Sequence, residues 1–195
     1  GEEIGFYIQQ GKEERYLEYK GSMLWNRDDT KVKIAQAMMA MSNLRNGGVI
    51  VVGMKETKRG VWVPDTMTDE QVSSFTQDDI AQWVNDYAVP AVRFTVEPFL
   101  LDTNKFVIIK VREFDTFPTI CRKPKPLGGR EVLKKGSIYY RSNSKNESAP
   151  ISSDEDMREL IGLAVNKGVA GEIERLRALG LVTAFPVAQE DDVLK

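Results

Sequence analysis

Residues 49–54, with the sequence VIVVGM, limit the fold more than any other part of the chain. This segment is short, continuously apolar and rich in β-branched residues, which is typical of a buried strand. An amphipathic helix is predicted over residues 29–43, because apolar side chains recur there at the i, i+3, i+4, i+7 spacing, at Ile34, Ala37, Met38 and Met41. Residues 46–48, Asn-Gly-Gly, make the turn between them. This order predicts a layered fold with both α and β structure.

The rest of the chain extends the same pattern. Further strands are predicted at residues 13–20, 61–63, 92–97, 105–112 and 136–141, and further helices at 78–87, 154–166 and 172–179. The tract 117–129 is rich in Pro, Lys and Gly and is expected to be a loop with extended segments. We therefore expect an α+β fold, with a mixed, twisted sheet of about five to six strands flanked by helices. A domain over residues 1–150 and a C-terminal helical extension over 151–195 are expected.

The composition excludes several kinds of chemistry. The chain has no histidine and a single cysteine, Cys121. Ser-His-Asp and Cys-His catalysis are therefore excluded, as are zinc sites built from Cys and His. A metal site would need carboxylate and carbonyl oxygens, which suit Mg²⁺ or Mn²⁺. One thiol, no signal peptide and no apolar run of membrane-spanning length predict a cytoplasmic location and no membrane contact.

The charge of the chain is concentrated in its middle. Residues 105–145 contain 11 basic and 3 acidic residues, a net charge of +8, whereas the segments 1–104 and 146–195 each carry −5. A basic block of this kind can hold a polyanion, and an exposed tyrosine such as Tyr140 can stack on a base. The predicted nucleic-acid-binding residues are Arg122, Lys123, Lys125, Arg130, Lys134, Lys135, Tyr140, Arg141 and Lys145. The alternative is a solvated loop with ordinary surface charges.

A second group of charges lies near the N-terminus. In an extended chain Glu18 and Lys20 share one face, with about 7 Å between them. A bend before the strand would bring Glu13 close to them. Two carboxylates beside a lysine are the minimum for holding a divalent cation against a phosphate. Glu56, after the buried strand, is a candidate third carboxylate. The alternative is an exposed strand that carries surface charges.

These motifs, taken in order, resemble the Schlafen AlbA_2 family. The resemblance rests on Glu13 followed by Glu18-Tyr19-Lys20, then on Ala40-Met41-Ser42-Asn43 and Gly47-Gly48, then on residues 49–54, and finally on residues 139–144, YYRSNS. It implies nucleic-acid binding by a domain of the family's fold. Some members of the Schlafen branch are endoribonucleases that cut structured RNA such as tRNA, through three carboxylates and a divalent metal. Glu13, Glu18 and Lys20 match two of these acids and the neighbouring lysine; Glu56, or less well Asp65, is the nearest match to the third acid.

Three functions are consistent with the sequence. The first is a nucleic-acid-binding domain that acts as an endoribonuclease with Mg²⁺ or Mn²⁺, using Glu13, Glu18, Lys20 and Glu56. The second is a DNA-binding domain of a transcriptional regulator without catalysis, in which Glu18 and Lys20 form a structural ion pair. The third is a protein-interaction domain, in which the acidic C-terminal segment pairs with the basic block of another copy and the helices at 154–166 and 172–179 supply a dimer contact. A homodimer is expected.

Overall fold

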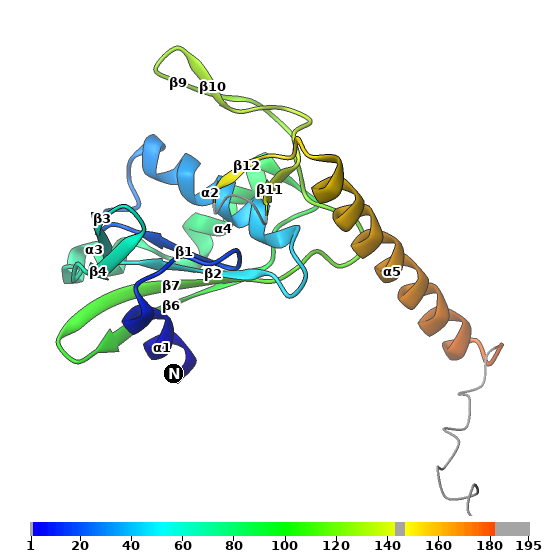
Figure 1. Cartoon of the computed structure of the whole chain (residues 1–195). Helices are drawn as coiled ribbons and strands as arrows, with labels where there is room; N and C mark the ends of the chain where they lie inside the picture. Colours follow the sequence, from blue (N-terminus) through cyan, green and yellow to red (C-terminus); the bar gives the residue numbers. More distant parts are fainter. Residues whose placement is uncertain (1, 143–146, 182–195) are drawn as a thin grey trace, which may run out of the picture.

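The centre of the molecule is a four-stranded sheet in the order β1-β2-β7-β6 (Figure 1). The computed structural model describes residues 2–142 and 147–181. The strands are β1 (Leu17–Lys20), β2 (Gly48–Val52), β7 (Asn104–Val111) and β6 (Phe94–Leu101). β1 runs parallel to β2, whereas the β2–β7 and β7–β6 pairs are antiparallel. The prediction of a mixed sheet in an α+β fold is confirmed.

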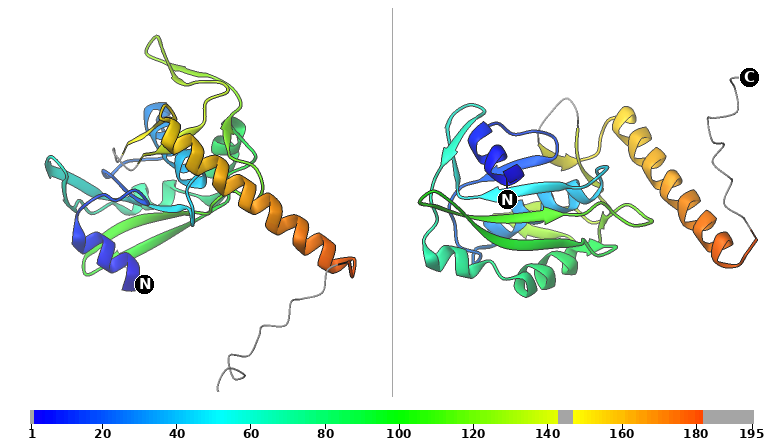
Figure 2. Two further views of the ribbon diagram at one scale, coloured as in Figure 1. Left: turned by 45° about the vertical axis from the view of Figure 1, so that its right-hand side comes forward. Right: turned by 90° about the horizontal axis from the view of Figure 1, so that it is seen from below.

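The remaining strands pair in twos outside this sheet, so that the central sheet is narrower than the expected five to six strands. Each pair is antiparallel. The pairs are β3 (Met54–Lys58) with β4 (Val61–Pro64), β5 (Ala88–Val89) with β8 (Ile120–Cys121), β9 (Lys125–Leu127) with β10 (Arg130–Leu133), and β11 (Tyr139–Arg141) with β12 (Ser148–Pro150). The β9–β10 hairpin projects from the body of the molecule (Figures 1 and 2).

Helices cover both faces of the central sheet because its strands are apolar on both sides. Ile50 of β2 and Ile109 of β7 face a core that includes residues of α2 (Asp28–Ser42) and α4 (Gln77–Tyr87). Val51 and Ile108 point the other way, into a smaller core under α1 (Glu2–Gln10). This alternation is the period of two that a strand imposes on its side chains.

The helix predictions are partly confirmed. α2 and α4 match the predicted segments 29–43 and 78–87, and Thr76 caps α4 by accepting a hydrogen bond from the Asp79 N–H at 3.2 Å. Two helices were not predicted: α1, and α3 (Asp69–Ser74).

The C-terminal helices were predicted wrongly as two separate helices. The structure has one helix of 25 residues, α5 (Asp154–Ala178). Gly168 and Gly171 lie inside it and do not end it, because a glycine lowers helix propensity without blocking the backbone hydrogen bonds as proline does. Its first three turns pack on the body through Leu160 and Leu163, and its later part extends away from the other elements (Figure 2). No helix among residues 2–142 and 147–181 is long and apolar enough to cross a membrane.

Candidate nucleic-acid interface

The buried side chain of Arg141 fixes the position of Glu18, one of the predicted site acids. The Arg141 side chain is fully buried, and its guanidinium forms an ion pair with Glu18, which is 6% exposed. Arg141 also donates from Nε to the Arg15 carbonyl oxygen at 2.8 Å and from Nη2 to the Glu14 carbonyl oxygen at 3.1 Å. These bonds join β11 to the chain leading into β1, although the two segments are more than a hundred residues apart.

Both carboxylate oxygens of Glu18 are engaged. Oε1 accepts from the Lys20 ammonium, while Oε2 accepts from Arg141 and, at 3.0 Å, from the Ser148 hydroxyl. Glu18 and Lys20 therefore lie on one face of β1, as their spacing predicts, and they are joined by an ion pair. A carboxylate shared by two cations is fixed in position and is already neutralised.

Glu13, Glu18 and Lys20 line one cavity of about 380 Å³. The Tyr19 N–H donates to Glu13 Oε1 at 2.9 Å, which holds the Glu13 side chain beside β1. Burial raises the pKa of Glu13 above its ordinary value, and the charge of Glu18 adds to this shift, although the Tyr19 N–H opposes it. The expected proximity of these three residues is present in the structure.

The predicted third acid, Glu56, lies outside this cavity, whereas Glu147 lines it together with Glu13 and Glu18. Glu56 is exposed on β3, does not line this cavity, and accepts a hydrogen bond from the Gly60 N–H at 2.9 Å. Asp65 does not line the cavity either. Within residues 2–142 and 147–181, no group of three His, Cys, Asp or Glu side chains is placed to hold a metal ion. Both carboxylate oxygens of Glu18 moreover already accept hydrogen bonds from cations, Lys20 and Arg141.

Three exposed basic residues of the predicted set lie on or beside the β9–β10 hairpin. Arg130, Lys134 and Lys135 are exposed, and no ion pair joins any of them to another described residue. Lys123 and Lys125 are half-buried and pair with Asp86 and, at 2.6 Å, with Asp28. The hairpin therefore presents three unneutralised cations, Arg130, Lys134 and Lys135, which we call the hairpin cations.

Two predicted contact residues lie in the interior, which corrects their expected position on the surface. Arg141 is buried by its pairing with Glu18, and Tyr140 is 3% exposed in a small core with Leu160 and Leu163. The Tyr140 hydroxyl accepts from Arg15 at 2.8 Å, and burial raises its pKa to about 12. Neither side chain is open to a nucleic acid. Lys145 lies outside the described residues.

Arg122 is exposed at a shallow hollow of about 900 Å³ between the start of α2 and α4. Trp25, Lys31 and the half-buried Trp83 line the same hollow. The half-buried Trp83 therefore places an aromatic side chain beside basic residues, which the buried Tyr140 does not.

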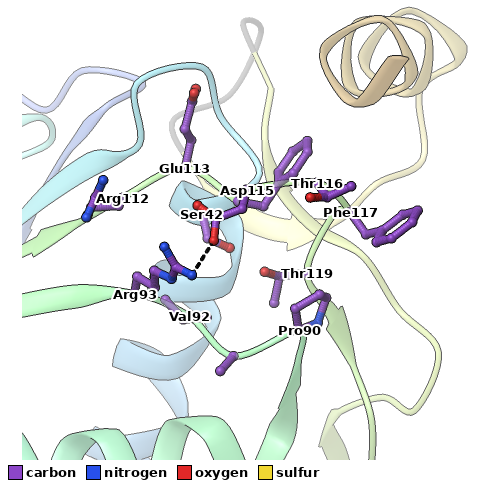
Figure 3. Close-up of a pocket in the computed structure, with 12 residues that line it drawn as sticks. Ser42, Pro90, Val92, Arg93, Arg112, Glu113, Asp115, Thr116, Phe117 and Thr119 are labelled. Atoms are coloured by element: carbon purple, nitrogen blue, oxygen red, sulfur yellow. Dashed lines mark ion pairs between the residues drawn. The ribbon is translucent and has the colours of Figure 1, made fainter. Parts of the chain in front are cut away.

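A third cavity, of about 240 Å³, lies between the end of α2 and the chain around β6 and β7 (Figure 3). Arg93 reaches across it to Asp115, with 2.6 Å between Nη2 and Oδ2 (Figure 3). Phe117 is 68% exposed at its rim. None of the predicted site residues lines this cavity. Of the two arginines that line it, Arg93 is neutralised by Asp115, which leaves Arg112 as its one arginine without a described ion pair, against three such cations at the hairpin.

Gln36 connects the cavity of Glu13, Glu18 and Lys20 to the hairpin. Lys33 and Gln36 of α2 both line the cavity, and Gln36 Nε2 donates to the Val132 carbonyl oxygen of β10 at 2.8 Å. The hairpin is thereby held against α2 beside the cavity. Lys33 is an exposed charge of the predicted helix, but its position beside Glu18 depends on how α2 packs on the sheet.

The Schlafen AlbA_2 family model matches residues 13–150, so the chain belongs to this family. No curated protein matches the chain. Two solved structures are similar to it. One is the crystal structure of the DIP2311 protein from Corynebacterium diphtheriae, with 14% identity and a TM-score of 0.49, covering 81% of this chain and 27% of that chain. The chain therefore spans about a quarter of the DIP2311 protein.

The other is a solution structure from Nitrosomonas europaea, of the N-terminal domain of a protein named as ATP-dependent DNA helicase RecG-related. It has 16% identity and a TM-score of 0.49, and the similarity covers 78% of this chain and 94% of that domain.

Proposed function

We propose that this chain is a nucleic-acid-binding domain that holds the phosphate backbone with the projecting β9–β10 hairpin. The observation that carries this proposal is the exposure of the hairpin cations without a described acidic partner. Such cations bind phosphates and release condensed counterions. The net charge of +8 over residues 105–145 and membership of the Schlafen AlbA_2 family support the same function.

The test is binding of labelled tRNA, single-stranded RNA and duplex DNA, followed by fluorescence anisotropy. Lys134→Glu with Lys135→Glu should weaken binding by about tenfold or more, because two attractive charges become repulsive near phosphates. The matched control is Lys58→Glu with Arg59→Glu, the same charge reversal on the β3–β4 hairpin. Equal losses in both variants would contradict the assignment to the β9–β10 hairpin.

Metal-dependent cleavage of structured RNA is the second candidate. The observation in its favour is that Glu13, Glu18 and Lys20 line one cavity, which Gln36 connects to the hairpin. The misfit of Glu56 ranks it below binding. The same RNA samples, incubated with Mn²⁺ or with EDTA, report on it: cuts that need Mn²⁺ and disappear in Glu13→Gln would establish cleavage. Intact RNA that is still retained by the protein would leave a binding domain.

Two finer predictions from the sequence remain proposals. A cytoplasmic location is proposed from the single cysteine of the chain. A homodimer is also proposed, and the structure offers a particular surface for it on α5.

A further inference from the structure

One side of α5, from Ile161 to the cap residue Leu179, exposes a row of apolar side chains. Ile161, Val165, Val169 and Leu179 are between 54% and 61% exposed, Ile173 is 38% exposed, and Leu176 is half-buried. From Ala164 to Leu181 no side chain is buried. We call these six residues the α5 stripe.

The six positions form a stripe because they recur every three or four residues, which places them on one side of the helix. Leu160 and Leu163, which anchor the helix to the body, lie on the opposite side. The helix therefore has one apolar side that is used and another that is open to solvent. Figure 2 shows from two directions that the later part of α5 stands clear of the body.

A helix of this composition gains little from standing alone in water. It contains Gly168 and Gly171, both poor helix formers, and most helical stability in proteins comes from packing an apolar face. Contiguous exposed apolar surface of this kind marks an interaction site. We therefore expect the α5 stripe to pack against a partner.

We propose that the partner is the same helix of a second copy of the chain, packed antiparallel about Val169. The spacing of the stripe is nearly the same when read from either end. An antiparallel pairing centred on Val169 sets Val165 opposite Ile173, and it sets Ile161 opposite Arg177, one residue from Leu176, of the second copy. This is the self-complementary contact that a two-fold axis requires.

The charge of α5 favours the same orientation. Residues 154–166 carry four acidic residues and one basic residue, whereas residues 167–178 carry three basic and two acidic residues. An antiparallel pair therefore brings the basic half of each helix toward the acidic half of the other. A parallel pair would bring the two acidic halves together and would also align the two helix dipoles.

The first test is the solution mass, measured by light scattering during gel filtration. The wild-type chain should elute at twice its 22.0 kDa mass, and Val165→Glu with Val169→Glu should halve this mass. The control is Ala170→Glu with Ala178→Glu, which adds the same charge to exposed positions away from the stripe and should leave the dimer intact. A monomeric wild-type chain would overturn the proposal and leave the stripe to a different partner.

Disulfide trapping tests the orientation and does not depend on how the glutamate variants fold. Val169→Cys should form a disulfide-linked dimer under mild oxidation, because the two copies of residue 169 face each other at the axis. Ile161→Cys and Leu176→Cys should not cross-link alone but should cross-link when mixed. Cross-linking of Ile161→Cys with itself would show a parallel pair and overturn the proposal. The wild type is the control, since its only thiol, Cys121, is buried.

Discussion

Arg141 and Glu18 are 123 residues apart in the sequence, yet their ion pair is the most buried one among the described residues. Separating such charges from water is costly, and the cost is offset here by hydrogen bonds to the Arg15 and Glu14 carbonyl oxygens and to Ser148. The consequence is that Arg141 acts as a structural residue that positions Glu18. The motif around Tyr139 and Arg141 therefore indicates the correct family, but the prediction that Arg141 contacts nucleic acid is wrong because its side chain is buried.

We expect Arg141→Met to lower the free energy of unfolding by about 3–5 kcal/mol, because the change leaves Glu18 buried without its main partner. Urea denaturation followed by circular dichroism measures this loss. The control is Arg130→Met on the exposed hairpin, for which we expect a change within about 0.5 kcal/mol. A loss below about 1 kcal/mol for Arg141→Met would show that the pair does not hold β11 to β1.

At the scale of elements, α5 is attached to the body by two ion pairs as well as by Leu160 and Leu163. Glu159 pairs with Arg15 at 2.8 Å, and Glu113 pairs with Lys167 at 2.5 Å. The hydrogen bond from Arg15 lowers the pKa of Glu159, although burial opposes this. Burial raises the pKa of Glu113, but the Lys167 ammonium and the Asn46 N–H outweigh it, so this pKa is lowered as well.

The stability of the α5 attachment should therefore fall in acid. A carboxyl whose pKa is lowered by folding contributes stability above its unfolded value of 4.5, and this contribution disappears as the pH falls through the folded value. We expect each pair to contribute about 0.5–1 kcal/mol, because both are partly solvated. Urea denaturation at pH 7 and at about pH 3 should show a larger acid-induced loss in the wild type than in Glu113→Gln with Glu159→Gln. Equal losses would contradict the assignment.

The elements that could be predicted are those whose signal is local. The buried strand at residues 49–54 and the helices at 29–43 and 78–87 carry their own apolar period. In contrast, α1 has only two buried side chains, Ile4 and Ile8, so its pattern is weak. The two-stranded sheets depend on partners elsewhere in the chain, and α5 continues through Gly168 and Gly171, between the two segments that the sequence predicts as separate helices.

In the candidate site, too, only the features that depend on local sequence could be predicted. The spacing of Glu18 and Lys20 on a strand was enough to place them together. Whether Tyr140 and Arg141 faced solvent was not encoded locally, because Arg15, Glu18 and α5 bury them. The role of Gln36 likewise depends on a contact with a hairpin 96 residues further along the chain.

In the whole molecule, the exposed positive charges of the β9–β10 hairpin are separate from the negative charges of Glu13 and Glu18 in the neighbouring cavity. Its net charge of −2 conceals the basic hairpin, while the acidic cavity beside it holds Glu13 and Glu18, the latter neutralised by Lys20 and Arg141. Local fields govern the approach of a polyanion more than net charge does. The chain should therefore bind nucleic acid in spite of its low pI of 5.4, and binding should depend strongly on salt.

The most direct test of this account is the salt dependence of nucleic-acid binding, measured by anisotropy for the wild type and for Arg130→Ala with Lys134→Ala and Lys135→Ala. Each phosphate contact contributes about 0.7–0.9 to the slope of log K against log salt. The account predicts that the triple variant binds more weakly and that its slope is smaller by about 2–3. An unchanged slope, whatever the affinity, would show that the β9–β10 hairpin does not contact phosphate.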